Sequence, residues 1–410
     1  MRHFRSGRLV LALLFAAAQI AAAQSKDTQP YLVLVSFDGF RHDYAKLHNA
    51  RNLLKLGQDG AAAEGLRPGF PSMTFSSHFT IVTGVHAERH GIVDNAFYDP
   101  ETDEEYQFSK TAQEGKWYRR TPLWVLAERQ GIRTATYSWP GSEAAIEGVR
   151  PSIWRKYRDQ GTHDEQVDQA LEWLRLPLPE RPRLVILYFS AIDSLGHKMG
   201  PDAPEMPATV QELDRIIGRL RDGLRQLPLR VNLVIVSDHG MRAIDGRIAL
   251  RDFTDLSKIK TVQGGGAILH LYTTDPQIRE KVYSDLRGKS PHFEVYRRAE
   301  TPPHWHYTRD PRIGDLVVVA KGTKLLDARM SEPVNRTPTP FNLGAHGFDS
   351  GMFPDMKGVF FAAGPHIRAG KKLPVVDSIH LFPFLAKLLG VKIPADIDGK
   401  LSVLTSIYRK

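Results

Sequence analysis

Three apolar segments that each lead into an acidic residue constrain the fold more than any other feature of the chain. They span residues 31–37, 184–189 and 231–236, and they precede Asp38, Asp193 and Asp238. Such continuous runs of Val, Leu and Ile are typical of strands that are covered on both faces in a parallel sheet. Because open α/β sheets place their functional sites at the carboxyl ends of these strands, the three carboxylates are predicted to meet at one edge of the sheet.

Helical patterns fill the intervals between these strands. Apolar residues recur at three- and four-residue steps from Val210 to Leu227, which predicts an amphipathic helix. The alternation of strand and helix predicts an α/β fold with a mostly parallel central sheet flanked by helices. Shorter strand and helix patterns at residues 266–340 predict a smaller inserted α+β lobe, which divides the catalytic core into residues 24–265 and 341–410.

The first 23 residues have the pattern of a secretory signal peptide, with an uncleaved anchor as the alternative. Arg2, Arg5 and Arg8 precede an apolar stretch too short to span a bilayer, and three alanines form a cleavage site before Gln24. The chain has no cysteine, so disulfides and thiolate metal sites are excluded. We expect export across the inner membrane into a bacterial periplasm, with no membrane anchor after processing.

The turn at residues 67–84 contains the candidate nucleophile, Thr74. Pro68 and Pro71 disfavour helix before it, and an apolar segment that ends at Gly84 predicts a short helix after it. Thr74 is therefore predicted to be the N-cap of this helix. Two interpretations stay open, since a hydroxyl at this position can simply cap the helix or can meet a phosphate at its N-terminus.

Six candidate metal ligands lie at four places along the chain. They are Asp38; Asp193 and His197, which are one helical turn apart; Asp238 and His239; and His346 in a glycine-framed segment. Together with Thr74 they form a set of oxygen and nitrogen ligands that suits zinc and divides into two metal positions. Each residue alone has an ordinary alternative as a cap, an exposed pair or a loop residue, but their recurrence at strand ends favours a metal site.

Nine short motifs follow one another through nearly the whole chain after residue 35. They are Ser36-Phe-Asp-Gly39, Met73-Thr-Phe75, Thr80-Ile-Val-Thr-Gly84, His90-Gly-Ile-Val-Asp-Asn95, Trp139-Pro-Gly-Ser142, Asp193-Ser-Leu-Gly-His-Lys-Met-Gly-Pro201, Ser237-Asp-His-Gly-Met241, Arg312-Ile-Gly-Asp315 and Gly344-Ala-His-Gly-Phe-Asp349. In this order they resemble the motifs of the nucleotide pyrophosphatase/phosphodiesterase family within the alkaline phosphatase superfamily.

The resemblance implies a role for each matching residue. One zinc ion would be held by Asp193, His197 and His346, and a second by Asp38, Thr74, Asp238 and His239. Thr74 would be the nucleophile and form a covalent intermediate, and Asn95 would donate a hydrogen bond to the phosphoryl group beside the backbone N–H of Phe75. The chain departs from the family at Ser77, where members often have Asn, which bears on the shape of the nucleophile turn.

The resemblance also implies an aromatic nucleoside pocket. Phe75, Tyr157 and Tyr188 are its candidates, although Tyr188 ends a strand and has a core position as its alternative. Other histidines fit loops better than metal sites, namely His86 and His90 after Gly84, and His304 and His306 in the inserted lobe. Asn335 begins a glycosylation sequon that is meaningful only in a eukaryotic secretory host.

These features predict an exported two-zinc phosphodiesterase that releases a nucleoside monophosphate. The alternatives are a phosphomonoesterase of the same superfamily and a non-catalytic zinc-dependent binding protein. Monoesterases require a cation at the phosphoryl group, and Ser138–Gly141 offers none, although Arg133, Arg150, Arg155 and Lys156 lie nearby in sequence. The +9 net charge is not gathered into a basic stripe, so no stable nucleic-acid partner is expected. Nucleoside triphosphates, dinucleotides, nucleotide sugars and lipid or choline diesters all fit as small-molecule substrates, and the oligomeric state stays open.

Overall fold

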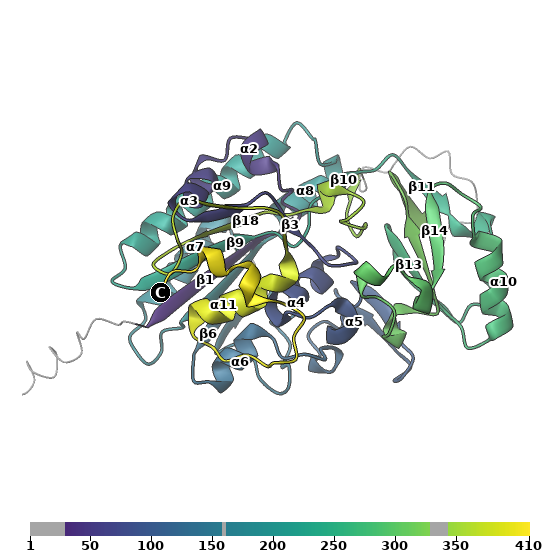
Figure 1. Cartoon of the computed structure of the whole chain (residues 1–410), viewed down its shortest axis with the longest axis horizontal. Helices are drawn as coiled ribbons and strands as arrows, with labels where there is room; N and C mark the ends of the chain where they lie inside the picture. The colour runs from purple at the N-terminus through teal and green to yellow at the C-terminus, as the bar shows by residue number, and fades with distance from the viewer. Residues whose placement is uncertain (1–28, 158–160, 329–342) are drawn as a thin grey trace, which may run out of the picture.

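A mixed sheet of eight strands forms the centre of the structure (Figure 1). The computed structural model describes residues 29–157, 161–328 and 343–410. In spatial order the strands are β19 (Lys371–Leu373), β2 (Ala61–Ala63), β18 (Phe360–Ala363), β9 (Arg230–Val236), β1 (Pro30–Phe37), β8 (Leu184–Phe189), β6 (Thr134–Tyr137) and β7 (Ile153–Arg155).

The three apolar segments form the middle of this sheet. β1 lies between β8 and β9 and is parallel to both, with Leu34 opposite Ile186 on one side and Val234 on the other. β6 and β7 continue the parallel arrangement, whereas β18 is antiparallel to β9 and β2. The predicted fold class is confirmed, with antiparallel pairs confined to one side of the sheet.

Alternate residues of β1 pack into two separate hydrophobic cores. Leu32 and Leu34 belong to one core, and Tyr31, Val33 and Val35 belong to the other. This two-residue period is the consequence of strand geometry, and it explains why the sequence of β1 is apolar without alternation.

Helices cover both faces of the sheet (Figure 1). One core includes residues of α3 (Arg51–Asp59), α7 (His163–Arg175) and α9 (Met206–Arg225). The other core includes residues of α4 (Thr74–Thr83), α6 (Leu123–Arg129) and α11 (Leu381–Leu389).

A smaller lobe beside the central sheet has a hydrophobic core of its own. Its antiparallel sheet has the order β12 (Thr261–Gly265), β13 (Ile268–Tyr272), β15 (Leu316–Ala320) and β14 (Phe293–Arg297). α10 (Pro276–Leu286) and the parallel pair of β11 (Gly246–Ala249) and β16 (Lys324–Asp327) complete it. β11 and β12 both lie before residue 266, where the sequence predicted that the smaller lobe begins. The division into residues 24–265, 266–340 and 341–410 stays a prediction. Residues 1–23, Asn335 and the predicted end of the lobe at residue 340 lie outside the described ranges.

A buried arginine attaches this smaller lobe to the segment between α5 (Ala87–His90) and α6. Arg312 Nε donates a hydrogen bond to Asp99 Oδ2 at 2.8 Å, and its Nη1 donates to the carbonyl oxygens of Gly91 and Trp117. Because a buried guanidinium is costly unless its donors are satisfied, these bonds hold the two parts of the chain in one arrangement.

Candidate active site

The predicted ligands converge at the carboxyl ends of the central strands. Asp38 follows β1 directly, and Asp238 and His239 follow β9. Asp193 and His197 lie on α8 (Ala191–Met199), which begins two residues after β8 ends. The carboxyl ends of β1, β8 and β9 lie at this edge of the sheet, which is where α/β sheets form their functional sites.

One group of ligand atoms surrounds His239. Its Nε2 lies 3.0 Å from Asp238 Oδ2, 3.3 Å from Asp38 Oδ1 and 3.3 Å from Thr74 Oγ1. The two carboxylates and His239 are buried, and their ligand atoms all lie within 4.8 Å of one another.

A second group is centred on Asp193. Its Oδ1 lies 3.4 Å from His197 Nε2 and 3.6 Å from His346 Nε2. The rings of His346 and His239 stack with their centroids 3.6 Å apart, so the two groups of ligands adjoin. The structure thus brings the seven candidate ligands together at one edge of the sheet. The ligand atoms that lie within 4.8 Å of one another form two groups, Asp38 with Asp238 and His239, and Asp193 with His239 and His346. Because His239 belongs to both groups, the assignment of each ligand to one of two metal positions stays a prediction.

Backbone carbonyls fix the orientation of the three imidazoles. The Nδ1 atoms of His197, His239 and His346 lie 2.9 Å from the carbonyl oxygens of Gly344, Gly240 and Ser72, respectively. A carbonyl can only accept a hydrogen bond, so each Nδ1 carries a proton and each ring directs its Nε2 atom into the site. This is the arrangement in which histidine binds a metal ion.

Three carboxylates at this site are too close to be ionised together without a cation. Burial and the neighbouring Asp238 raise the pKa of Asp38 well above its ordinary value, and burial raises the pKa of Asp193. Burial acts in the same direction on Asp238, but His239 and His78 outweigh it and lower the pKa of Asp238. Asp238 in turn outweighs burial and raises the pKa of His239.

The unpaired oxygens at the site fit metal ions. Asp38 Oδ1, Asp193 Oδ1 and Asp238 Oδ2 are buried and have no hydrogen-bond partner among the described residues. A buried carboxylate oxygen needs either a proton, a donor or a cation. These atoms face the Nε2 atoms of the histidines, so the residues present form a suitable pair of sites for divalent cations with nitrogen and oxygen ligands.

Thr74 is the first residue of α4 rather than its N-cap. Met73 is the N-cap, and no side chain caps the helix, so the predicted cap position of Thr74 is wrong by one residue. The hydroxyl of Thr74 instead lies beside His239 Nε2. The interpretation as a helix cap is therefore excluded, and the interpretation as a nucleophile stays a prediction. The helix ends as predicted at Gly84, whose left-handed φ of 69° and contact with Phe382 leave no room for a Cβ.

Asn95 lies directly beside the N-terminus of α4. The backbone N–H of Phe75 donates to Asn95 Oδ1 at 3.0 Å. This bond assigns the amide, because only Oδ1 can accept it, and Nδ2 has no hydrogen-bond partner among the described residues. Asn95 therefore has two N–H donors to offer, whereas the N–H of Phe75 that the resemblance implied as a second donor is engaged with Asn95.

The three predicted aromatic residues occupy different environments. Tyr188 is only 5% exposed, and its hydroxyl donates a hydrogen bond to Asp38 Oδ2, so it supports a ligand rather than lining an open slot. Tyr157 is 50% exposed and donates to Ser190 Oγ at 3.2 Å. Phe75 contacts Phe108, with ring centroids 5.7 Å apart.

Phe108 is an aromatic residue of the site that sequence reasoning missed. It is 51% exposed, and it follows Glu104–Gln107 (β5) on a hairpin whose other strand begins directly after Asn95. The pairing of that hairpin brings it next to Phe75, and no local pattern in the sequence reveals this.

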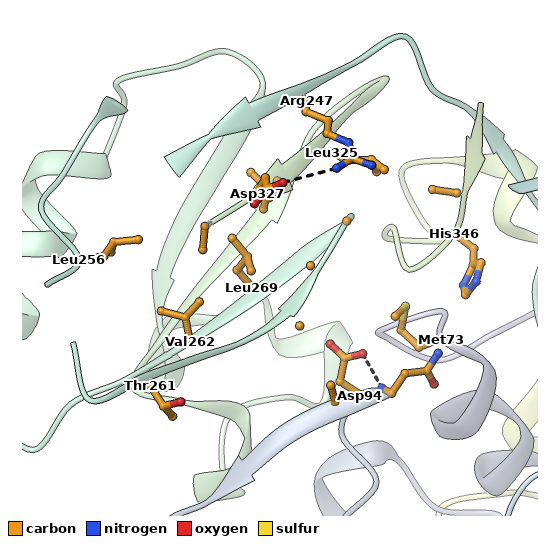
Figure 2. A pocket seen from close by; sticks show the side chains of 18 of the residues that line it. Met73, Asp94, Arg247, Leu256, Thr261, Val262, Leu269, Leu325, Asp327 and His346 are labelled. Atoms are coloured by element: carbon orange, nitrogen blue, oxygen red, sulfur yellow. Dashed lines mark hydrogen bonds and ion pairs between the residues drawn. The ribbon is translucent and has the colours of Figure 1, made fainter. Parts of the chain in front are cut away.

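A cavity of about 750 Å³ lies between the predicted site and the smaller lobe (Figure 2). His346, Met73 and Asp94 line one side, and apolar residues such as Leu269 and Val262 line the other. Its cations belong to the smaller lobe, and each is already engaged. Arg247 pairs with Asp327, Arg251 Nε donates to the carbonyl of Ala328, and Lys260 pairs with Asp103.

The other cations and histidines considered from the sequence lie in contacts of their own. Arg150 donates to the carbonyl of Glu143, Arg155 donates to Gln169, and Lys156 lies over the ring of Trp154. His86 stacks on His306, with ring centroids 3.9 Å apart, and His90 is buried beside Thr80. His304 lies 3.4 Å from Asp349. The groups of metal-ligand residues found within the described ranges include none of these histidines.

Comparisons with known proteins identify the family of the chain. The family model for type I phosphodiesterase/nucleotide pyrophosphatase matches residues 32–349. The chain belongs to this family. It is therefore a hydrolase of the nucleotide pyrophosphatase and phosphodiesterase class, whose members depend on metal ions.

Individual relatives match over most of the chain. Human ectonucleotide pyrophosphatase/phosphodiesterase family member 7 is 33% identical over 97% of this chain and 87% of its own length. Mouse family member 1 is 34% identical over 93% of this chain, which spans 43% of that longer relative. A structure of mouse ectonucleotide pyrophosphatase/phosphodiesterase 5, an inactive threonine-to-alanine variant in complex with AMP, is 27% identical and covers 93% of this chain and 100% of its own, with a TM-score of 0.85. None of the helices in the described part of the chain is long and apolar enough to cross a membrane.

Proposed function

We propose that this chain is an exported, zinc-dependent phosphodiesterase that cleaves phosphodiester or phosphoanhydride bonds through a covalent intermediate on Thr74 and releases a nucleoside monophosphate. The observation that carries the proposal is the position of Thr74 Oγ1, 3.3 Å from His239 Nε2 in a group of buried ligand atoms. The solved relative supports a nucleotide substrate, because it binds AMP in a threonine-to-alanine variant that is inactive.

Each zinc ion has a proposed set of ligands. Asp193, His197 and His346 would hold one ion, and Asp38, Thr74, Asp238 and His239 would hold the other. Bound zinc would lower the pKa of a coordinated hydroxyl and neutralise charge on the phosphoryl group. The threonine hydroxyl requires such help, since it is a weak nucleophile at its ordinary pKa.

The reaction has two displacements at phosphorus. In the first, Thr74 Oγ1 gives up its proton and bonds to phosphorus, and the bond from phosphorus to the leaving oxygen breaks. In the second, a water molecule bonds to phosphorus and gives up a proton, and the bond to Thr74 breaks and restores the hydroxyl. Asn95 Nδ2 would donate to a non-bridging oxygen in both steps, as charge gathers there.

Neutral donors at the phosphoryl group favour a diester over a monoester. A diester carries one negative charge, whereas an ionised monoester carries two and requires a further cation. The cations that line the cavity already have partners: Arg247 pairs with Asp327, Lys260 pairs with Asp103, and Arg251 donates to the carbonyl of Ala328; Asn95 is neutral. The nucleoside substituent would lie against Phe75, with Phe108 and Tyr157 at its margins.

A ratio of specificity constants tests this assignment. With zinc-loaded protein, kcat/KM for a nucleoside p-nitrophenyl diester should exceed that for p-nitrophenyl phosphate by about 100-fold or more, which equals ~2.7 kcal/mol in the transition state. Elemental analysis should find about two zinc ions per chain. A ratio near or below one would move the enzyme to the phosphomonoesterase alternative, and activity in metal-free protein would exclude the metal-dependent route.

Export rests on residues 1–23, which have the signal-peptide pattern. Expression of the full chain in a bacterium should yield periplasmic protein that begins at Gln24, as read by mass spectrometry of the intact protein. Retention of the first 23 residues in a membrane fraction would instead support the uncleaved anchor.

A further inference from the structure

A buried pair of side chains, Asp94 and His270, lies directly behind Asn95. Both residues are 0% exposed, and Asp94 Oδ2 lies 2.8 Å from His270 Nε2. Asp94 precedes Asn95 in the loop after α5, whereas His270 lies in the middle of β13 in the smaller lobe. The pair therefore joins the two parts of the chain at the residue next to the phosphoryl donor.

The partners of His270 determine where its protons are. Its Nδ1 lies 2.8 Å from the carbonyl oxygen of Ile313, which can only accept, so Nδ1 carries a proton. Asp94 Oδ2 and His270 Nε2 lie at hydrogen-bond distance, so one of the two atoms must donate to the other. A second proton therefore lies between them. The two side chains are therefore joined by a hydrogen bond, which satisfies both buried groups.

Asp94 also binds the main chain of Asn95, so it links His270 to Asn95. Its Oδ1 accepts the backbone N–H of Asn95 at 2.5 Å, and the carbonyl of Asn95 accepts the backbone N–H of Phe108 at 2.9 Å. With the side-chain bond to Phe75, the main chain of Asn95 is held on both sides and its amide is held in one orientation. Figure 2 shows Asp94 at the wall of the cavity, with the bond to its neighbour drawn as a dashed line.

The smaller lobe also packs tightly against Asp94. Gly264 on β12 has a φ of +85°, and a Cβ at that position would lie 2.8 Å from the carbonyl oxygen of Ile268 and 3.3 Å from Asp94 Oδ2. A side chain at position 264 would therefore press on Asp94, and glycine lets β12 lie close to the buried pair.

We propose that His270 is a positioning residue for the phosphoryl-transfer reaction. Through Asp94, it holds Asn95 so that Nδ2 faces the reacting phosphoryl group, and the smaller lobe thereby contributes to catalysis without touching the substrate. This inference rests on the proposed function in one respect, namely that Asn95 donates a hydrogen bond in the transition state.

A double-mutant cycle tests this role. Asn95→Ala should lower kcat/KM for a nucleoside p-nitrophenyl diester by about 100-fold to 1,000-fold, as loss of one transition-state donor does. His270→Ala should lower it by about 10-fold to 100-fold, chiefly in kcat, because the ground-state contacts of the substrate are unchanged. In the Asn95→Ala background, His270→Ala should cost less than about twofold, because no donor is left to position.

Two further variants separate positioning from structural support. Asp94→Asn should retain activity within about threefold of wild type, because the amide nitrogen can donate to His270 Nε2 while the amide oxygen accepts the N–H of Asn95. Asp94→Ala removes both bonds and should lower activity as much as His270→Ala does. The matched control is Tyr272→Phe on the same strand. Its hydroxyl accepts the N–H of Tyr98 and donates to the carbonyl of Arg312, so the variant removes one bond between the two parts of the chain and one within the smaller lobe, without touching Asp94. It should lower Tm and leave kcat/KM unchanged.

The outcomes distinguish this inference from the proposed function. If Asn95→Ala is fully active, the proposed donor role and the positioning role both fail. If Asn95→Ala is impaired but the losses from His270→Ala and Asn95→Ala multiply, only the positioning role is overturned. The same conclusion follows if Tyr272→Phe lowers kcat as much as His270→Ala does. Should His270→Ala not fold, the cycle is run with Asp94→Ala and Asn95→Ala, with the same criteria.

Discussion

Replacement of Thr74 by alanine should abolish turnover and leave the fold intact. Thr74 is partly exposed at the first position of α4 and does not cap the helix, and among the described residues its hydroxyl has one hydrogen-bond partner, His239. Alanine is a better helix former than threonine by up to about 0.7 kcal/mol, whereas the loss of a partly buried methyl group costs at most about 0.8 kcal/mol. These effects oppose each other, so the free energy of unfolding should change by less than about 1 kcal/mol, and Tm by no more than about 4 °C.

The effect on activity should be far larger than the effect on stability. Loss of the nucleophile should lower kcat for a nucleoside p-nitrophenyl diester by about 10⁴-fold or more, as measured by release of p-nitrophenolate. Thr74→Ser is the matched control, because it keeps the hydroxyl and should keep part of the activity. Circular dichroism and zinc content should match wild type in both variants. Activity of Thr74→Ala within about tenfold of wild type, or loss of activity only through unfolding, would refute the reasoning.

Two other predictions follow from the electrostatics and the aromatic contacts of the site. Without metal, the pKa values of Asp38 and His239 are raised. Each group therefore keeps its proton up to a higher pH than usual, and zinc binding must displace these protons. Zinc affinity should therefore rise with pH, and the zinc-dependent increase in Tm should be larger at pH ~8 than at pH ~6; an increase that shrinks with pH would contradict the assignment of these ligands. Phe108→Ala should raise KM for a nucleoside diester about fivefold, which corresponds to the loss of ~1 kcal/mol of aromatic contact with the base. The change in KM should be smaller for methyl p-nitrophenyl phosphate, which has no base. Equal changes for both substrates in steady-state kinetics would remove Phe108 from the nucleoside pocket.

The features that were predictable from the sequence are local ones. β1, β8 and β9 are apolar because both faces are covered, and this pattern is visible without any partner strand. The candidate ligands other than His346 were found because each follows such a strand or lies one helical turn from another ligand, whereas His346 was found in a glycine-framed segment. Their division into two sets came from the family resemblance and stays a prediction, because His239 lies close to ligands of both sets.

The remaining features depend on contacts between distant segments. Phe108 reaches Phe75 through the pairing of a hairpin, and His270 reaches Asp94 from residues 176 positions later in the chain. The hydroxyl of Tyr188 bonds to Asp38 on the adjacent parallel strand, which turns an expected base-stacking residue into a support for a ligand. The predicted cap at Thr74 differed by one residue, because helix starts depend on the preceding backbone as well as on side-chain preference.

The stereochemical course at phosphorus tests the central claim most directly. A nucleoside p-nitrophenyl phosphorothioate of single configuration would be turned over by zinc-loaded enzyme in the presence of methanol, and the configuration of the methyl ester product would be determined by ³¹P NMR. Two in-line displacements through Thr74 predict net retention of configuration. Net inversion would mean that the acceptor attacks phosphorus in one step, and it would contradict a covalent intermediate on Thr74.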